Sequence, residues 1–196
     1  MKTVGVEQWY IDSCYKLKYM VPKAHAAAYV IAALRIAWYK IYYPVQFYSA
    51  FFTVRGGAID AVAAVQGKEA VKRKMNEIKL KGNEATAKEE SQYVVLQIVI
   101  EMLARGYEFL PVDLNKSDWR VYKIEDGKIR LPFSAIDGIG ETAAQAIADA
   151  VQRNPDGFVA SDDLANEPGV GKSVVDALRA AGALGDLPET TQISLF

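Results

Sequence analysis

Sulfur and imidazole ligands are nearly missing from this 196-residue sequence, which contains one cysteine, Cys14, and one histidine, His25. A single cysteine excludes an intramolecular disulfide, a cysteine-rich zinc site and a redox pair of thiols. The carboxylates form no Asp-x-Asp pair or cluster, so no two-magnesium site and no catalytic residue are expected in this chain. A reducing, cytoplasmic location is the expectation that follows.

Long hydrophobic runs are also missing. The most apolar stretch has an uncharged run of only nine residues, 26–34, before Arg35, Lys40 and Pro44 interrupt it, whereas a membrane span needs about 20 apolar residues. The opening residues lack the apolar core of a signal peptide. With 51% hydrophobic residues, we expect a soluble chain of one or two globular domains and no membrane partner.

Net charge is close to zero, at −1, but the two parts of the chain differ in sign. Residues 1–130 contain 20 basic and 14 acidic side chains, and residues 131–196 contain 3 basic and 10 acidic ones. Two differently charged modules are therefore predicted. The densest basic segment, 68–81, is either a solvated helix face or a surface that faces phosphate, and the sequence leaves both readings open.

Strong helix signals cover much of the first half of the chain. Good helix formers predict a helix over 23–43, and Pro44 is suited to the first position of a second helix over 44–54. Apolar residues at helical spacing predict a third helix over 87–105, which Gly106 would end.

Short extended runs replace the helical pattern between 107 and 133. Asp126-Gly127 separates the runs 119–125 and 128–133, and this dipeptide is typical of a β-hairpin turn. Small helices are expected after residue 133. The predicted fold class is mostly α with a small β element.

Two glycine turns open directly into helices. The segment 136–140 precedes an amphipathic run, and about thirty residues later 168–172 does the same. In each turn the residue between the glycines can anchor the loop in the core, while exposed N–H groups at the helix start can donate to a phosphate. The candidate backbone-binding residues are Gly138, Ile139, Gly140, Thr142, Gly169, Val170, Gly171, Lys172 and Ser173.

Other readings of these glycines remain open. Residues 138–143 also match a loose dinucleotide fingerprint with Asp162 downstream, which would indicate a small oxidoreductase and requires a βαβ unit. A phosphate-binding P-loop ending at Ser173 is excluded because residue 166 is Asn166. Tight turns that bind nothing are the third reading.

The pair of turns resembles a tandem helix-hairpin-helix module, which holds the sugar-phosphate backbone of duplex DNA without reading bases. Because this part of the sequence is acidic, we expect the module alone to bind DNA weakly and basic surfaces in residues 1–130 to assist. A stand-alone DNA-binding adaptor is one protein class that this resemblance allows.

A wider resemblance covers essentially the whole chain. The sequence is similar to the bacterial C-family replicative polymerases, specifically the PolC-type DNA polymerase III alpha subunit. The matching segments are 9–14, 19–30, 35–37, 43–44, 52–55, 85–89, the first glycine turn and the last five residues, 192–196.

The resemblance implies a C-terminal piece of such a polymerase. It assigns 1–106 to the last part of the helical fingers, 107–133 to a β-hairpin connector, 134–187 to the helix-hairpin-helix duplex-binding domain and 188–196 to a flexible tail. The palm, with its metal-binding aspartates and Mg²⁺, lies outside this chain, which is therefore expected to be inactive alone and to hold no cofactor. The implied partners are primer-template duplex DNA, the sliding clamp and the remainder of the polymerase.

Further residue roles follow from the same resemblance. Lys23, His25 and Tyr29 would lie near the incoming nucleotide and template, although Lys23 and His25 are also placed to cap the long helix. The tail resembles a clamp-binding peptide in which Gln192 hydrogen-bonds at a groove edge while Leu195 and Phe196 fill an apolar pocket. A frayed end with a chance Leu-Phe pair is the alternative.

Overall fold

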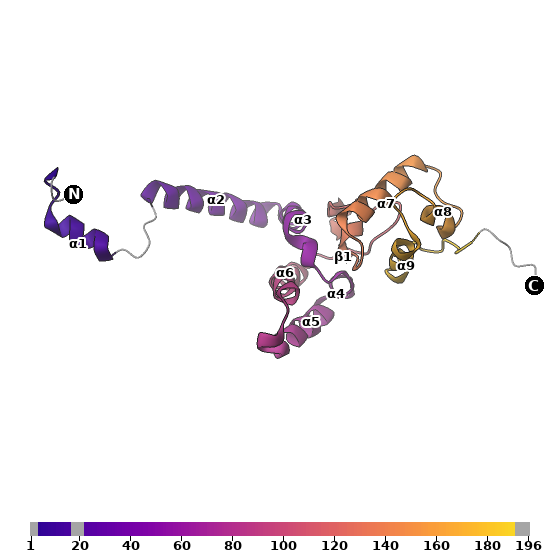
Figure 1. Ribbon diagram of the computed structural model, residues 1–196, viewed down its shortest axis with the longest axis horizontal. Coiled ribbons are helices and arrows are strands. Elements are labelled where there is room, and N and C mark those ends of the chain that lie inside the picture. The colour runs from indigo at the N-terminus through magenta and orange to yellow at the C-terminus, as the bar shows by residue number, and fades with distance from the viewer. Residues whose placement is uncertain (1–3, 17–21, 191–196) are drawn as a thin grey trace, which may run out of the picture. The chain divides into compact units, whose positions relative to one another are not determined.

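The structure is a computed structural model that describes residues 4–16 and 22–190. Its chain divides into two compact units, Met1–Tyr42 and Tyr43–Phe196. Figure 1 shows the elements of both units in order.

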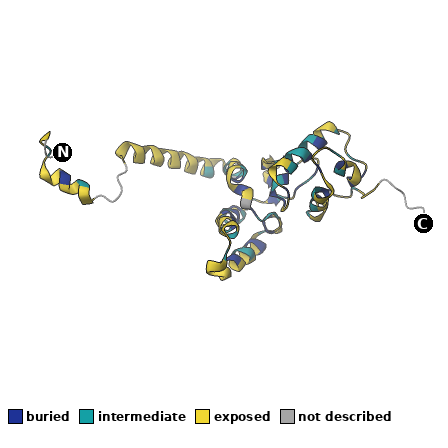
Figure 2. Ribbon diagram, in the orientation of Figure 1, coloured by how far each residue is buried: buried dark blue, intermediate teal, exposed yellow. Residues whose placement is uncertain are grey.

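The first unit contains α1 (Gln8–Lys16) and α2 (Lys23–Tyr42). Ile11 is the buried residue of α1, whereas α2 has no buried residue along its 20 positions (Figure 2). Large apolar side chains of α2 are open to solvent, including Tyr29 at 66% and Leu34 at 65% exposure. No helix within the described ranges is long and apolar enough to cross a membrane.

The second unit begins with a helical layer whose starts follow local signals. Pro44 occupies the first turn of α3, the Asp60 carboxylate accepts from the Ala63 N–H to cap α4, and Thr86 and Glu89 form a reciprocal capping box on α6. The elements are α3 (Pro44–Arg55), η2 (Gly56–Ala58), α4 (Ala61–Gln66), α5 (Lys68–Lys81), η3 (Gly82–Glu84) and α6 (Ala87–Ala104).

A small sheet follows. Its strands β1 (Phe109–Leu110), β2 (Lys123–Glu125) and β3 (Lys128–Arg130) lie in the order β1-β3-β2. Strand β1 is parallel and β2 antiparallel to β3. The predicted hairpin is present, and Asp126 (φ 50°) and Gly127 (φ 77°) form its turn.

The rest of the second unit is helical, with η4 (Phe133–Ala135), α7 (Glu141–Arg153), α8 (Ser161–Ala165) and α9 (Lys172–Ala180). The predicted class, mostly α with a small β element, is confirmed.

One hydrophobic core joins all parts of the second unit, from Tyr48 to Leu184. Its aromatic centre is Phe52, whose ring centroid lies 5.1 Å from that of Phe109 and 5.7 Å from that of Tyr122. This core therefore fixes the glycine turns relative to the helices α3 to α6 and the sheet.

Candidate nucleic-acid interface

The first glycine turn links η4 to α7. Gly138 has φ +87°, a left-handed conformation that favours glycine, and Gly140 is the extended N-cap of α7 with φ −75°. Ile139 between them is 4% exposed and belongs to the core. The Ile139 N–H donates to the Ile136 carbonyl at 3.1 Å, which closes the turn.

The second glycine turn repeats this geometry before α9. Gly169 has φ +81°, Gly171 is the extended N-cap with φ −97°, and Val170 is 3% exposed. The Val170 N–H donates to the Glu167 carbonyl at 3.0 Å. A Cβ at Gly169 would lie 2.9 Å from the Cβ of Ala146, so this turn packs directly on α7.

Backbone donors are open to solvent at the helix start that follows each turn. In the described part of the chain, the N–H groups of Gly140, Glu141 and Thr142 donate no hydrogen bond, and the same holds for 171–173. All six residues are exposed. Each helix start can therefore direct three unused donors and the positive end of its dipole at one anion.

The charges around the first turn include a cation from a distant element. Lys88, in the first turn of α6, holds its Nζ 3.2 Å from Oδ1 of Asp137. Both side chains are largely exposed, so the ion pair is weak and can rearrange. At the second turn Lys172 is exposed and is the first residue of α9.

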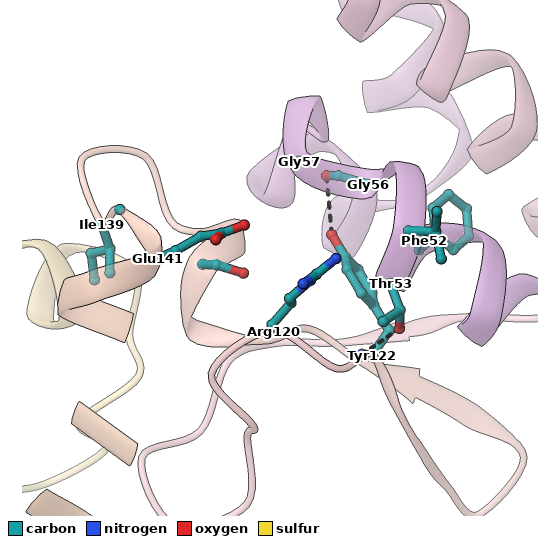
Figure 3. A pocket seen from close by; sticks show the side chains of 11 residues that line it. Phe52, Thr53, Gly56, Gly57, Arg120, Tyr122, Ile139 and Glu141 are labelled. Carbon is teal, nitrogen blue, oxygen red and sulfur yellow. Dashed lines mark hydrogen bonds between the residues drawn. The ribbon is translucent and has the colours of Figure 1, made fainter. Parts of the chain in front are cut away.

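A pocket of about 280 Å³ lies beside the first turn (Figure 3). Arg120 and Glu141 line it together with the Gly56-Gly57 segment. Among the described residues no carboxylate lies within 4.0 Å of the Arg120 guanidinium, which lies 5.9 Å from the centroid of the Trp119 ring. The pocket therefore adds a cation next to the unused donors of α7.

Tyr122 stiffens the opposite wall of this pocket. Its hydroxyl donates to the Gly56 carbonyl at 3.3 Å, and its backbone N–H donates to Oγ1 of Thr53 at 3.1 Å (Figure 3). Burial raises the pKa of the Tyr122 hydroxyl, so it stays protonated as a donor. A Cβ at Gly56 would lie 2.8 Å from that hydroxyl oxygen, so any larger residue here would force the buried Tyr122 ring to move.

Lys88 and Arg120 are the residues that sequence reasoning missed. The only signal was indirect: the excess of basic residues before position 130 and the acidic character of the glycine-turn region. Their positions depend on packing between segments far apart in the sequence.

The residues expected near nucleotide and template lie in the first unit. Lys23 is the first residue of α2, and the His25 and Tyr29 rings meet edge to face with centroids 4.6 Å apart. All three are exposed. Among the described contacts, the side chains of Lys23 and His25 make no hydrogen bond that caps α2.

The residues predicted to bind a clamp, Gln192, Leu195 and Phe196, lie outside the described residues. The segment that leads to them is held on α8. The N–H groups of Ser161 and Asp162 donate to the carbonyls of Pro188 and Glu189 at 2.9 and 3.1 Å.

The dinucleotide reading needs a strand after α7. Between residues 154 and 190, all described, the structure contains α8 and α9 and no strand, and Asp162 lies in the first turn of α8. The βαβ unit is therefore missing there. Within the described ranges no group of three or more His, Cys, Asp or Glu side chains could hold a metal ion.

Comparison with known proteins identifies relatives of the whole chain. Residues 106–192 match the model of the helix-hairpin-helix motif. The full chain is 43% identical to DNA polymerase III PolC-type of Thermotoga petrophila, 45% to that of Caldanaerobacter subterraneus subsp. tengcongensis and 43% to that of Bacillus cereus. Each alignment covers 100% of this chain and 14% of the relative, so the chain spans about one seventh of those proteins.

Proposed function

Because this chain is related along its whole length to part of PolC-type DNA polymerase III and carries a helix-hairpin-helix motif, we propose that it is the C-terminal segment of such a replicative polymerase. In this proposal it holds primer-template duplex DNA and tethers the enzyme to the sliding clamp. DNA synthesis belongs to the whole polymerase, with Mg²⁺ held in a palm outside this chain. The chain alone is expected to incorporate no nucleotide.

The observation that carries the DNA-binding proposal is the pair of equivalent helix starts. Each one presents three unused N–H donors behind a glycine turn, and each turn is fixed by one buried apolar residue, Ile139 or Val170. Such donors match phosphate oxygens and make no contact with base edges. The expected binding is therefore independent of DNA sequence.

Cations near the turns supply the charge that the acidic glycine-turn region lacks. Arg120 lines the pocket beside the first turn, Lys88 lies against Asp137, and Lys172 begins α9. A phosphate at the first turn would compete with Asp137 for Lys88. Each cation that contacts a phosphate also releases counterions, which strengthens binding at low salt.

The exposure of α2 supports a role within a larger protein. A helix that is apolar on all sides is stable when other protein covers it, and nothing in the described part of the first unit does so. We propose that the remainder of the polymerase covers α2 and places Lys23, His25 and Tyr29 near the nucleotide and template.

The tail is proposed to bind the clamp through Gln192, Leu195 and Phe196. Two adjacent large apolar side chains are costly to expose and are suited to fill a pocket on a partner. The hydrogen bonds of 188–189 to α8 would give the peptide a fixed starting point on the DNA-binding unit.

Duplex binding is tested with Gly140→Val and Gly171→Val. Both glycines have negative φ, and no atom lies within 4 Å of an added Cβ, so valine can be introduced without a clash at Cβ. We expect its two methyl groups to shield the N–H donors. We expect at least tenfold weaker binding of duplex DNA in a gel shift at low salt, with no change in sequence preference. Ala104→Val, on the exposed last turn of α6, is the matched control. Equal affinity of both glycine variants and the control would refute the proposal.

Clamp binding is tested by titrating the 196-residue chain with sliding clamp. Deleting Leu195 and Phe196 is expected to abolish binding, and Gln192→Ala to weaken it, whereas Thr190→Ala serves as a control outside the peptide. Unchanged affinity after the deletion would refute the tail assignment and leave the DNA-binding proposal standing.

A further inference from the structure

Helix α5 presents a row of lysines to solvent. Lys68, Lys72 and Lys79 fall within an arc of about 40° at 3.6 residues per turn, and they span about 16 Å at a rise of 1.5 Å per residue. All three are exposed. We call these residues the α5 lysine row.

The buried face of α5 lies next to this row. Ala70, Val71 and Ile78 are buried, with Val71 at 0% exposure, and they belong to the common core of the second unit. The α5 lysine row is therefore exposed along the edge of a packed helix face. It keeps a constant place relative to the glycine turns, which the same core holds.

Nearby carboxylates leave most of the row without an ion pair. Among the described residues, no carboxylate lies within 4.0 Å of Lys68 or Lys79, and Lys72 pairs with Glu69 at 2.8 Å. Both side chains of that pair are exposed, so the pair contributes little to stability and can separate easily. Three other acids near α5 form ion pairs with other lysines: Asp60 and Glu77 with Lys74, and Glu89 with Lys81. Glu90 lines a shallow pocket together with Lys79 but lies more than 4.0 Å from its ammonium group.

We propose that the α5 lysine row is a second contact with the DNA backbone, separate from the glycine turns. A length of about 16 Å matches the axial rise of about five phosphates of one strand at 3.4 Å each. The inference rests on the proposed function, because it assumes that the chain holds duplex DNA. It also identifies a basic surface that can assist the acidic glycine-turn region.

The test replaces all three lysines, as Lys68→Gln, Lys72→Gln and Lys79→Gln, in the 196-residue chain. Affinity for a primer-template duplex is measured between 50 and 300 mM salt, and circular dichroism verifies the fold. Each lost phosphate contact reduces the magnitude of the negative slope of log K against log salt by about 0.9. We expect the magnitude of the slope to fall by about 2 to 3 and the affinity at 0.1 M salt to fall about 100- to 1,000-fold.

A matched control removes the same charge elsewhere. Lys116→Gln, Lys123→Gln and Lys128→Gln together take three exposed lysines from the sheet region of the same unit. The proposal is overturned if the magnitude of the slope falls by less than 1 for the α5 triple variant. An equal fall for the control also overturns it.

The outcomes also separate this inference from the function on which it rests. If Gly171→Val weakens binding and the α5 triple variant does not, the glycine turns bind DNA and the α5 lysine row is only a solvated face. If the unchanged chain binds no duplex at 50 mM salt, the DNA-binding function fails and the α5 contact fails with it.

Discussion

Alanine substitution of the four turn glycines should separate backbone requirements from DNA contact. Gly138 and Gly169 have φ near +80 to +90°, whereas Gly140 and Gly171 have negative φ. An added Cβ meets no atom within 4 Å at Gly138, Gly140 or Gly171, but lies 2.9 Å from the Cβ of Ala146 at Gly169. The four changes are chemically identical, so differences in stability report the local backbone and packing.

The expected costs follow from these values. A non-glycine residue in the left-handed region costs about 1–2 kcal/mol, so Gly138→Ala should lower the free energy of unfolding by about that amount. Gly169→Ala adds overpacking against Ala146, worth about 1–3 kcal/mol more. At Gly140 and Gly171 the reduced entropy of the unfolded chain, about 0.4–1 kcal/mol, opposes the poorer N-cap quality of alanine. These two variants should stay within about 0.5 kcal/mol of the parent.

Urea unfolding of the four variants provides the measurement, with the slope m checked for constancy. The expected order of destabilisation is Gly169→Ala, then Gly138→Ala, then the two N-cap variants together. If Gly140→Ala or Gly171→Ala proves as destabilising as Gly138→Ala, the assigned turn conformations are wrong. A gel shift on the same proteins then shows whether the N-cap variants lose DNA affinity without losing stability.

Three further outcomes follow from contacts outside the turns. Hydrogen bonds from Arg130 lower the pKa of Glu125 from 4.5 to about 2, so their stabilisation is complete above the ordinary carboxyl pKa and is lost as pH falls towards 2. Glu125→Gln should therefore weaken the dependence of the urea unfolding midpoint on pH between pH 5 and 2. A pH dependence equal to that of the parent would contradict this. Phe52→Ala should cost about 3–5 kcal/mol because the ring is 1% exposed at the aromatic centre; a loss below 1 kcal/mol in urea unfolding would reject that role. Removing residues 188–196 should speed hydrogen exchange of the Ser161 amide, which loses its acceptor, and unchanged protection would argue against the bond.

Elements with strong local signals were predictable from the sequence. The helices expected over 23–43, 44–54 and 87–105 are Lys23–Tyr42, Pro44–Arg55 and Ala87–Ala104 in the structure. In these cases proline or glycine defines an end, and such signals act within a few residues. The glycine turns were predictable for the same reason, since the buried residue between two glycines is a local pattern.

Features that depend on distant segments were not predictable. The parallel pairing of β1 with β3 joins two-residue and three-residue strands across a long loop, and α4 has six residues, too few for a clear periodicity. The ion pair of Lys88 with Asp137 and the position of Arg120 beside α7 follow from the shared core. A sequence gives the excess of basic residues but not which of them packing brings to a given turn.

The shared core also limits how this protein can be dissected. The Leu114 N–H donates to the Ala183 carbonyl at 2.9 Å, and Phe133, at 0% exposure, is packed in the same core as Phe52. A recombinant piece that starts at residue 134 would contain both glycine turns. It would, however, expose to solvent the apolar surfaces that fix the positions of these turns. A recombinant piece of residues 43–196 removes only the first unit and keeps those surfaces covered.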